Sequence, residues 1–356
     1  NGRTLNVTDS IKMNYSTQES NINVNISGNG TINCGSIAIG SDASFSKNVT
    51  RVCTLNSSIS YMNVNGNIFI RSYIGNNDKR RANGVFSHNG GTMVVNGVIN
   101  FINESYINRT SFVFGDNSPY LISKGLNLFS LPNTGNYTIT LNKTNSTVEY
   151  QRAEDQYVYG PTNYYNLISS VSGVKTLQGA VGVRNLTIKD ASNLTTAYNI
   201  TGNSAGRLEI NNTATLTLGS AYTTPTFPTN FTSGNIVFSP GTTVVYQGVD
   251  QQAVSSTPSA YKNLRIQGGG TKIIDGNIRV DSSLVLDNAR LSTGAYAEII
   301  LGKDVTISAA SGSFNSSEMI VTPVTGRLVK EGTQPSDFEI VYPIGANAFY
   351  YTPLEV

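Results

Sequence analysis

The chain has 356 residues, of which only 13% are charged, and its formal net charge at pH 7 is +2. Ordinary soluble proteins carry about 25% charged residues, whereas Thr, Ser, Asn and Gly dominate here. The small net charge provides no electrostatic case for binding nucleic acid or an anionic membrane. No apolar run approaches the ~18 residues that would span a bilayer. The length is enough for a large core and predicts two or three domains.

The N-terminal β region, residues 1–80, alternates apolar and polar residues in the pattern of half-buried strands. Within it, Cys34 and Cys53 flank a segment with a turn signal at 40–42, and this pattern predicts a hairpin. Because a hairpin brings its ends together, we predict a Cys34–Cys53 disulfide, with two buried free thiols as the alternative. A disulfide would imply an oxidising compartment outside the cytoplasm.

A predicted β module at 81–145 precedes an internal repeat. The series Thr-Val-x-Tyr-Gln, Asp-Gln, Tyr-x-Asn-Leu and Gly-x-Lys runs through Thr147–Ile188 and again through Thr243–Leu286, at offsets of 95 to 98 residues. In this comparison Asp155-Gln156 is matched to Asp250-Gln251. Because the offsets between several matched motifs differ by so few residues, the pattern indicates a true repeat.

The repeat sets the predicted domain boundaries and the fold class. We place the first β repeat at 146–240 and the second, with the C-terminal strands, at 241–356. We expect the proline-containing stretch 221–240 to be an extended linker or an irregular crossing. Helix signals are almost absent, and a period of about 95 residues suits one sandwich, so we predict an all-β chain of tandem β-sandwich-like modules. A β-solenoid, or parallel β-helix, is the alternative, because the alternation in Leu208–Leu218 is typical of coils that stack.

Several phrases carry a resemblance to a known class of protein. They are Phe-Ser-His-Asn-Gly-Gly-Thr at 86–92, Tyr-Asn-Leu at 165–167, Gly-Val-Lys-Thr-Leu at 173–177, Gly-Asn-Ile at 276–278 and Val-Tyr-Pro-Ile-Gly at 341–345. Together they resemble the long repetitive surface proteins that Bacteroidota secrete. The resemblance covers roughly residues 84–356 and leaves out 1–80. It implies an adhesin, stalk or fibre, with no shared catalytic set of residues.

The strongest local chemical signal is the triplet Asn-x-Ser/Thr, the acceptor sequence, or sequon, for N-linked sugar. It occurs at Asn6, Asn14, Asn25, Asn29, Asn48, Asn56, Asn103, Asn108, Asn136, Asn142, Asn145, Asn185, Asn193, Asn199, Asn211, Asn230 and Asn315. Random placement of the 42 Asn and 76 Ser and Thr would give about nine triplets, and 17 are present, 16 of them before residue 233. We therefore expect covalently attached glycans on exposed strands and loops. The alternative is that a chain rich in Asn and Thr forms such triplets without being modified.

Groupings that could catalyse a reaction are nearly missing. His88 is the only histidine, so a histidine triad or a site with several histidine ligands is confined to it, and we expect a structural role for this residue. Asp275, Asp281 and Asp287 recur every six residues and could form a weak calcium site, but turn residues are the favoured interpretation. We predict no catalytic residue, no metal and no cofactor, and we expect that the chain is not an enzyme.

The favoured function is a structural subunit of an extracellular, glycosylated fibre or surface appendage that assembles head to tail with copies of itself. A terminal strand that lacks a partner can add to the sheet edge of a neighbour. Leu5 and Val7 are the candidate donor residues, and Ile340 and Val356 mark the acceptor module. The chain starts at Asn1 rather than Met and stops within a predicted strand, so we expect a mature chain or an excerpt of a longer one.

Two other functions stay open. A cell-surface adhesin or carbohydrate-binding module would need an exposed aromatic or acidic cluster in a loop. A β-helical polysaccharide-degrading enzyme would need two carboxylates close together in a groove, and no spacing in the chain indicates such a pair.

Overall fold

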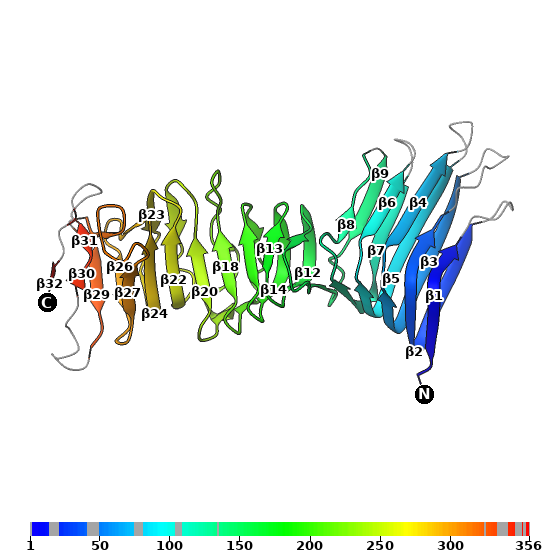
Figure 1. The fold of residues 1–356 in the computed structure, drawn as a ribbon, viewed down its shortest axis with the longest axis horizontal. Helices are drawn as coiled ribbons and strands as arrows, with labels where there is room; N and C mark the ends of the chain where they lie inside the picture. The colour runs from blue at the N-terminus through cyan, green and yellow to red at the C-terminus, as the bar shows by residue number, and fades with distance from the viewer. Residues whose placement is uncertain are drawn as a thin grey trace. The chain divides into compact units, whose positions relative to one another are not determined.

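The computed structural model describes residues 2–13, 21–40, 50–74, 81–103, 109–133, 135–323, 325–332, 341–345, 351 and 354–355. It divides into two compact units, Asn1–Ile168 (unit 1) and Ser169–Val356 (unit 2), which are coloured blue to green and green to red in Figure 1. Strands make up the regular structure of the described residues, apart from one 3₁₀ turn at Ser233–Asn235. The division falls within the predicted repeat 146–240.

Unit 1 contains the longest strands of the chain, together with shorter ones. In chain order they are β1 (Thr4–Met13), β2 (Ile22–Ile39), β3 (Thr50–Val64), β4 (Ile68–Ile74), β5 (Arg81–Val95), β6 (Ile99–Asn103), β7 (Arg109–Ser123), β8 (Phe129–Ser130), β9 (Asn136–Thr140), β10 (Thr147–Tyr150), β11 (Gln156–Val158) and β12 (Thr162–Ser169), which ends at the boundary of the unit.

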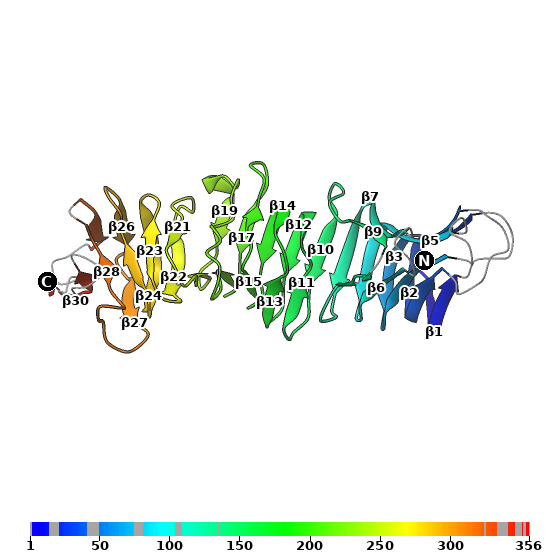
Figure 2. The same ribbon diagram turned by 90° about the horizontal axis from the view of Figure 1, so that it is seen from above.

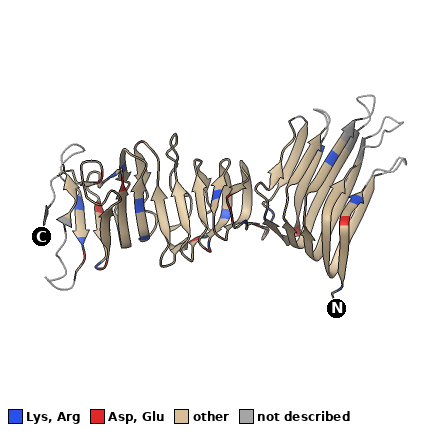
Figure 3. Cartoon of the chain, in the orientation of Figure 1, with Lys and Arg blue, Asp and Glu red and all other residues tan. Residues whose placement is uncertain are grey.

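Neighbouring strands of unit 1 pair in parallel, each with the strand one coil further along the chain. The hydrogen-bonded order is β10-β7-β5-β3-β2-β4-β6-β8, with β1 joined to β2 and β9 to β7. Ile22 lies opposite Cys53, and Cys53 lies opposite Gly84 in the next coil. Only the short pairing of β4 with β5 is antiparallel among the described strands of this unit. Figure 1 shows β2, β3, β5 and β7 side by side, and Figure 3 shows few charged residues on them.

Unit 2 is built from shorter strands. They are β13 (Val174–Leu177), β14 (Val181–Ile188), β15 (Asn193–Thr196), β16 (Ile200–Thr201), β17 (Leu208–Ile210), β18 (Thr215–Leu218), β19 (Ile236–Phe238), β20 (Thr243–Tyr246), β21 (Gln252–Val254), β22 (Tyr261–Gln267), β23 (Thr271–Ile274), β24 (Ile278–Asp287), β25 (Arg290–Ser292), β26 (Glu298–Leu301), β27 (Thr306–Ala309), β28 (Ile320–Val321), β29 (Arg327–Lys330), β30 (Val341–Tyr342), β31 (Ile344–Gly345) and β32 (Leu354–Glu355).

Three parallel stacks make up most of unit 2. One runs β13-β15-β18-β20-β22-β24-β26-β29, a second runs β21-β23-β25-β28-β31, and a third runs β14-β17-β19. In Figure 2, β14, β17 and β19 lie along one side of the unit and β13 and β15 along the other. The core between the stacks consists of columns of in-register apolar side chains. One column contains the buried residues Leu194, Leu216, Val244, Leu264 and Leu284.

The prediction of an all-β chain is confirmed, whereas tandem sandwich modules are not confirmed. The large parallel sheets fit the alternative, a β-solenoid. Ile22 opposite Cys53 and Thr271 opposite Arg290 show that one coil takes about 20 to 30 residues. The sequence repeat of about 95 residues therefore spans several coils instead of one sandwich, in which antiparallel pairing would dominate.

The predicted Cys34–Cys53 disulfide is wrong, because both cysteines are free and buried. The hairpin that would have joined them does not form, since β2 and β3 run parallel. Cys53 lies opposite Ile22 while Cys34 lies opposite Val64, so most of β2 separates the two thiols. At about 3.3 Å per residue this separation far exceeds the roughly 7 Å limit between the Cα atoms of a disulfide. The cysteines consequently carry no argument for an oxidising compartment.

Candidate functional site

The sequon asparagines that the structure describes lie on the outside of the coils. Of the 17, the structure describes 14, and none of these is buried. Nine are exposed: Asn6, Asn25, Asn29, Asn136, Asn142, Asn145, Asn199, Asn230 and Asn315. Five are half-buried: Asn56, Asn103, Asn185, Asn193 and Asn211. Asn14, Asn48 and Asn108 lie outside the described residues.

Some outward asparagines bond to each other across coils, because parallel in-register pairing stacks like side chains on like. The Nδ2 of Asn33 donates to Oδ1 of Asn6 at 2.8 Å, and Nδ2 of Asn56 donates to Oδ1 of Asn25 at 2.9 Å. N-linked sugar attaches at Nδ2. The hydrogen bond between these two residues therefore occupies Nδ2 of Asn56, the atom to which sugar would attach. In Asn25 it occupies only Oδ1.

Asn315 is the one sequon after residue 233, and its amide is fully engaged. Its Nδ2 donates to the carbonyl oxygen of Ser313 at 3.3 Å and to Oε2 of Glu318 at 3.2 Å. Its Oδ1 accepts from the backbone amide of Ser317 at 2.8 Å. These bonds indicate that Asn315 braces its own turn, although it is exposed to solvent.

The predicted strand-exchange residues Leu5 and Val7 lie on β1, which pairs in parallel with β2. The other edge of β1 has no strand partner among the described residues, and the Leu5 side chain is 55% exposed. Ile340 and Val356, the predicted acceptor residues, lie outside the described residues. The structure thus gives β1 one partner in its own chain and leaves one edge for a further strand.

Matched residues of the internal repeat form a buried hydrogen-bond network in each copy. In the first copy the hydroxyl groups of Tyr150 and Tyr164 are 3.0 Å apart. The backbone amide of Tyr159 donates to the Tyr150 hydroxyl at 3.0 Å, and the Tyr164 hydroxyl donates to the Tyr159 carbonyl at 2.7 Å. Burial raises the pKa of Tyr150 and Tyr164 well above the usual value, so both phenols stay protonated.

The second copy repeats this network: the hydroxyl groups of Tyr246 and Tyr261 are 2.9 Å apart. The backbone amide of Ser255 donates to the Tyr246 hydroxyl at 3.0 Å, and the Tyr261 hydroxyl donates to the Ser255 carbonyl at 2.5 Å. A buried glutamine accompanies each copy. Nε2 of Gln156 donates to the carbonyl oxygens of Ser123 and Gly125, and Nε2 of Gln252 donates to those of Leu218 and Pro225. Gln156 therefore corresponds to Gln252, one residue after the Gln251 matched by sequence.

Two other landmarks of the repeat are also structural. The ammonium of Lys272 donates to three carbonyl oxygens, those of Gly248, Asp250 and Gly269, and burial lowers the pKa of this lysine to about 8. Lys175 donates in the same way to the Ser172 carbonyl at 2.8 Å. These lysines fill turns that would otherwise hold unpaired carbonyl groups.

His88 is buried in unit 1, where Nε2 donates to the carbonyl oxygen of Tyr120 at 3.1 Å. Its ring packs edge-on against Phe114, with centroids 5.8 Å apart. Burial lowers the pKa of His88 to about 4, so the ring is neutral at physiological pH. Ser57 lies opposite His88 in the ladder but is also fully buried, and the pair is inaccessible to a substrate.

The aspartates that recur every six residues do not converge on a cation. Asp281 accepts from Lys262 at 2.8 Å and from Arg279 at 2.7 Å, and Asp287 accepts from Arg265 at 2.5 Å. Within the described part of the chain, no three His, Cys, Asp or Glu residues gather where they could hold a metal ion.

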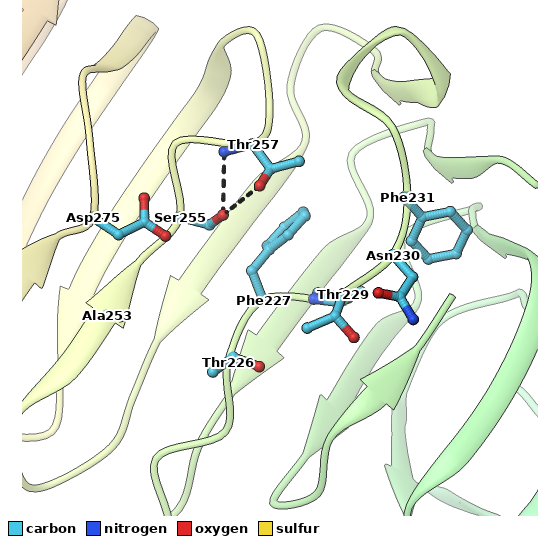
Figure 4. A pocket seen from close by; sticks show the side chains of 10 residues that line it. Thr226, Phe227, Thr229, Asn230, Phe231, Ala253, Ser255, Thr257 and Asp275 are labelled. Atoms are coloured by element: carbon cyan, nitrogen blue, oxygen red, sulfur yellow. Dashed lines mark hydrogen bonds between the residues drawn. The ribbon is translucent and has the colours of Figure 1, made fainter. Parts of the chain in front are cut away.

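A pocket of about 270 Å³ opens in unit 2 between the segment Thr226–Phe231 and the turns that carry Ser255, Thr257 and Asp275. Figure 4 shows Phe227 between Thr257 and Thr229, with Asp275 beyond Ser255 and Phe231 beyond Asn230. Ser255 donates to the Thr257 hydroxyl at 3.0 Å, and the backbone amide of Ser256 donates to Oδ1 of Asp275 at 2.6 Å. No sequence signal marked this pocket beyond the sequon at Asn230.

Comparisons with protein-family models, with curated proteins and with solved structures found no match. No helix in the described ranges is long and apolar enough to cross a membrane.

Proposed function

We propose that the chain is a structural subunit of an extracellular, glycosylated fibre or surface appendage. The observation that carries this proposal is the repeated parallel coil, in which each coil is hydrogen-bonded to the next and the interior is filled with in-register side chains such as the Leu194–Leu284 column. In such a stack each coil contacts only its neighbours, so the stack extends by addition of coils. A scaffold of this kind would give a fibre its length and provide an outer surface for attached glycans.

Attached sugar is supported by the outward position of every described sequon asparagine. A hydrophilic glycan coat would also add polar surface to a chain in which only 13% of the residues are charged. Head-to-tail assembly is supported by the outer edge of β1, which has no strand partner among the described residues and, with the exposed Leu5 side chain, forms a template for another strand. Because β1 is already paired with β2, this proposal exchanges the roles expected from the sequence: β1 offers the receiving edge, and the added strand would come from the last module of a second copy.

The test is electron microscopy of the native material without deglycosylation. We expect long filaments that repeat at about one subunit length, with additional density on outward asparagines. Subunits joined through the outer edge of β1 would support the assembly mechanism. Dispersed monomers with bare asparagines would contradict the proposal.

A second candidate function, an adhesin, is favoured by two exposed tyrosines. β15 and β18 are parallel neighbours, with Thr196 opposite Leu218. Tyr198 and Tyr222 follow the same ends of these strands and are 45% and 94% exposed. Exposed aromatic faces at one edge can stack on sugar rings. A glycan array probed with the native chain and with Tyr198→Ala/Tyr222→Ala tests this function, and equal profiles would contradict it.

A further inference from the structure

We propose that the pocket beside Asn230 binds a neutral pyranose ring, a site that is independent of whether the chain forms fibres. Its walls are the segment Thr226–Phe231 and the turns of the next coil that bear Thr257 and Asp275. Both walls lie in unit 2.

The polar groups at this pocket have capacity left for a ligand. Thr226 and Thr229 use their backbone groups in hydrogen bonds to Asn199, Ile200 and Gly202, while their exposed hydroxyls take part in none within the described residues. The amide of Asn230 has no hydrogen-bond partner in the described part of the chain either. Oδ1 of Asp275 accepts a hydrogen bond from the backbone amide of Ser256, which leaves Oδ2 to accept one from a ligand. Several hydroxyl, amide and carboxylate groups around one cavity match the hydroxyl groups of a sugar.

The apolar part of the pocket is a packed wall that holds the polar groups in place. Phe227 and Phe231 are only 3% and 5% exposed, so packing fixes their positions before any ligand arrives. The two rings therefore present almost no open face for stacking, and recognition of the sugar rests on hydrogen bonds between its hydroxyl groups and the polar rim. Phe227 contacts Phe238 edge-on, with centroids 6.3 Å apart, which holds the Phe227 ring in place.

Size and charge narrow the ligand class. A volume of about 270 Å³ lies just below the roughly 300 Å³ at which pockets for drug-sized ligands begin. It therefore suits a single sugar unit. Asp275 is the only charged residue of the lining, and it has no ion-pair partner among the described residues. A uronic, sialic or sulfated sugar would meet an uncompensated carboxylate, so the site favours a neutral hexose or N-acetylhexosamine.

The sugar has two possible sources, and the position of the sequon Asn230-Phe231-Thr232 separates them. A glycan carried by Asn230 itself would start at the rim of the pocket and could place a sugar inside it. A glycan from another molecule would need the pocket to be open. Thr232 does not line the pocket, so Thr232→Ala abolishes the acceptor triplet and leaves the lining intact.

The experiment uses the full chain with Thr232→Ala and saturation-transfer NMR with glucose, galactose, mannose and N-acetylglucosamine as probes. We expect saturable binding of at least one probe. Asp275→Asn should weaken it about tenfold, because the neutral amide keeps an oxygen for Ser256 but removes a charge-assisted hydrogen bond to the sugar. Thr229→Val should weaken it about threefold by removing one hydroxyl. The matched control is Asp250→Asn, at an exposed aspartate outside the lining.

Binding that Asp275→Asn and Thr229→Val weaken, and Asp250→Asn does not, supports the proposal. The glycosylated wild type then identifies the source. Equal binding by the wild type assigns the pocket to external glycans, whereas binding that appears only after enzymatic removal of the glycan assigns it to the sugar on Asn230. Absence of binding by all four probes, with an unchanged circular dichroism spectrum, would overturn the site. So would binding that neither pocket variant alters.

Discussion

The hydroxyl oxygen of Tyr246 lies 2.9 Å from that of Tyr261, and both rings are fully buried. Each buried phenol is satisfied, because the amide of Ser255 donates to Tyr246 and Tyr261 donates to the carbonyl of Ser255. The pair thereby ties the end of β21 to β20 and β22. Its recurrence at Tyr150 and Tyr164 shows that the sequence repeat preserves a brace between coils.

The first prediction concerns this brace. Tyr246→Phe should lower the free energy of unfolding by about 1–3 kcal/mol, because the Ser255 amide and the Tyr261 hydroxyl lose a buried partner. Urea unfolding monitored by circular dichroism measures the change. Tyr222→Phe, at a residue that is 94% exposed, is the control and should have no effect. Adding Tyr261→Phe should cost less than the sum of the single changes, and strict additivity would contradict the network.

Strand positions could be predicted from the sequence because they depend on local alternation, but the direction of pairing could not. Alternation places Tyr246 and Tyr261 on the buried side whatever strand lies beside them. The same period of two fits a hairpin and a parallel coil equally well. Cys34 and Cys53 therefore lie on neighbouring strands, as expected, yet opposite Val64 and Ile22 instead of each other.

The sugar pocket could not be predicted for a related reason. Phe227 and Phe231 belong to a proline-containing stretch that predicts a linker, and Asp275 belongs to the second sequence repeat. Stacking of coils of unequal length brings them to one cavity. The register between coils is set by those lengths and by core packing, neither of which is visible in any one segment. The outward position of the sequons within strands, such as Asn56 and Asn185, by contrast follows from alternation, whereas those at Asn142 and Asn230 lie in the connections between strands.

The second prediction concerns pH. Lys272 has a folded pKa of about 8, below the 10.5 of an unperturbed lysine, because burial disfavours its charged form. Between these values the unfolded chain binds more protons than the folded one, so this group makes stability rise as pH increases from about 8 towards 10. The wild type should therefore gain stability relative to Lys272→Met over this range in urea titrations. If the free energies of unfolding of the two proteins changed equally with pH, the lowered pKa of Lys272 would be contradicted.

The third prediction concerns the thiols. Burial raises the pKa of Cys34 to about 11 and also raises that of Cys53. Both should react slowly with a thiol reagent at pH 8 in the folded chain, because the reactive thiolate is scarce and inaccessible. In denaturant without reductant, two thiols per chain should react at once. A chain that releases thiols only after reduction would contain a disulfide and contradict the structure.

The fourth prediction concerns the sequon at Asn315. Its Nδ2 is bound to Glu318 and Ser313, so we expect no sugar there, whereas the exposed Asn142 and Asn199 should be occupied. Glycopeptide mass spectrometry of native material measures the occupancy of each site. Glu318→Ala should release one partner of Nδ2 and raise occupancy at Asn315. Full modification of Asn315 in the wild type would show that these hydrogen bonds do not protect it.

The last prediction tests the assembly edge. Leu5 is 55% exposed on β1, whose outer edge has no partner among the described residues. A charged side chain at such an edge opposes the addition of another strand. Leu5→Lys should therefore abolish or greatly shorten filaments while leaving the circular dichroism spectrum of the subunit unchanged. Leu131→Lys, at a leucine that is 38% exposed outside the strands, is the matched control and should assemble normally. Filaments of Leu5→Lys that equal those of the wild type in length would exclude the β1 edge as the joint.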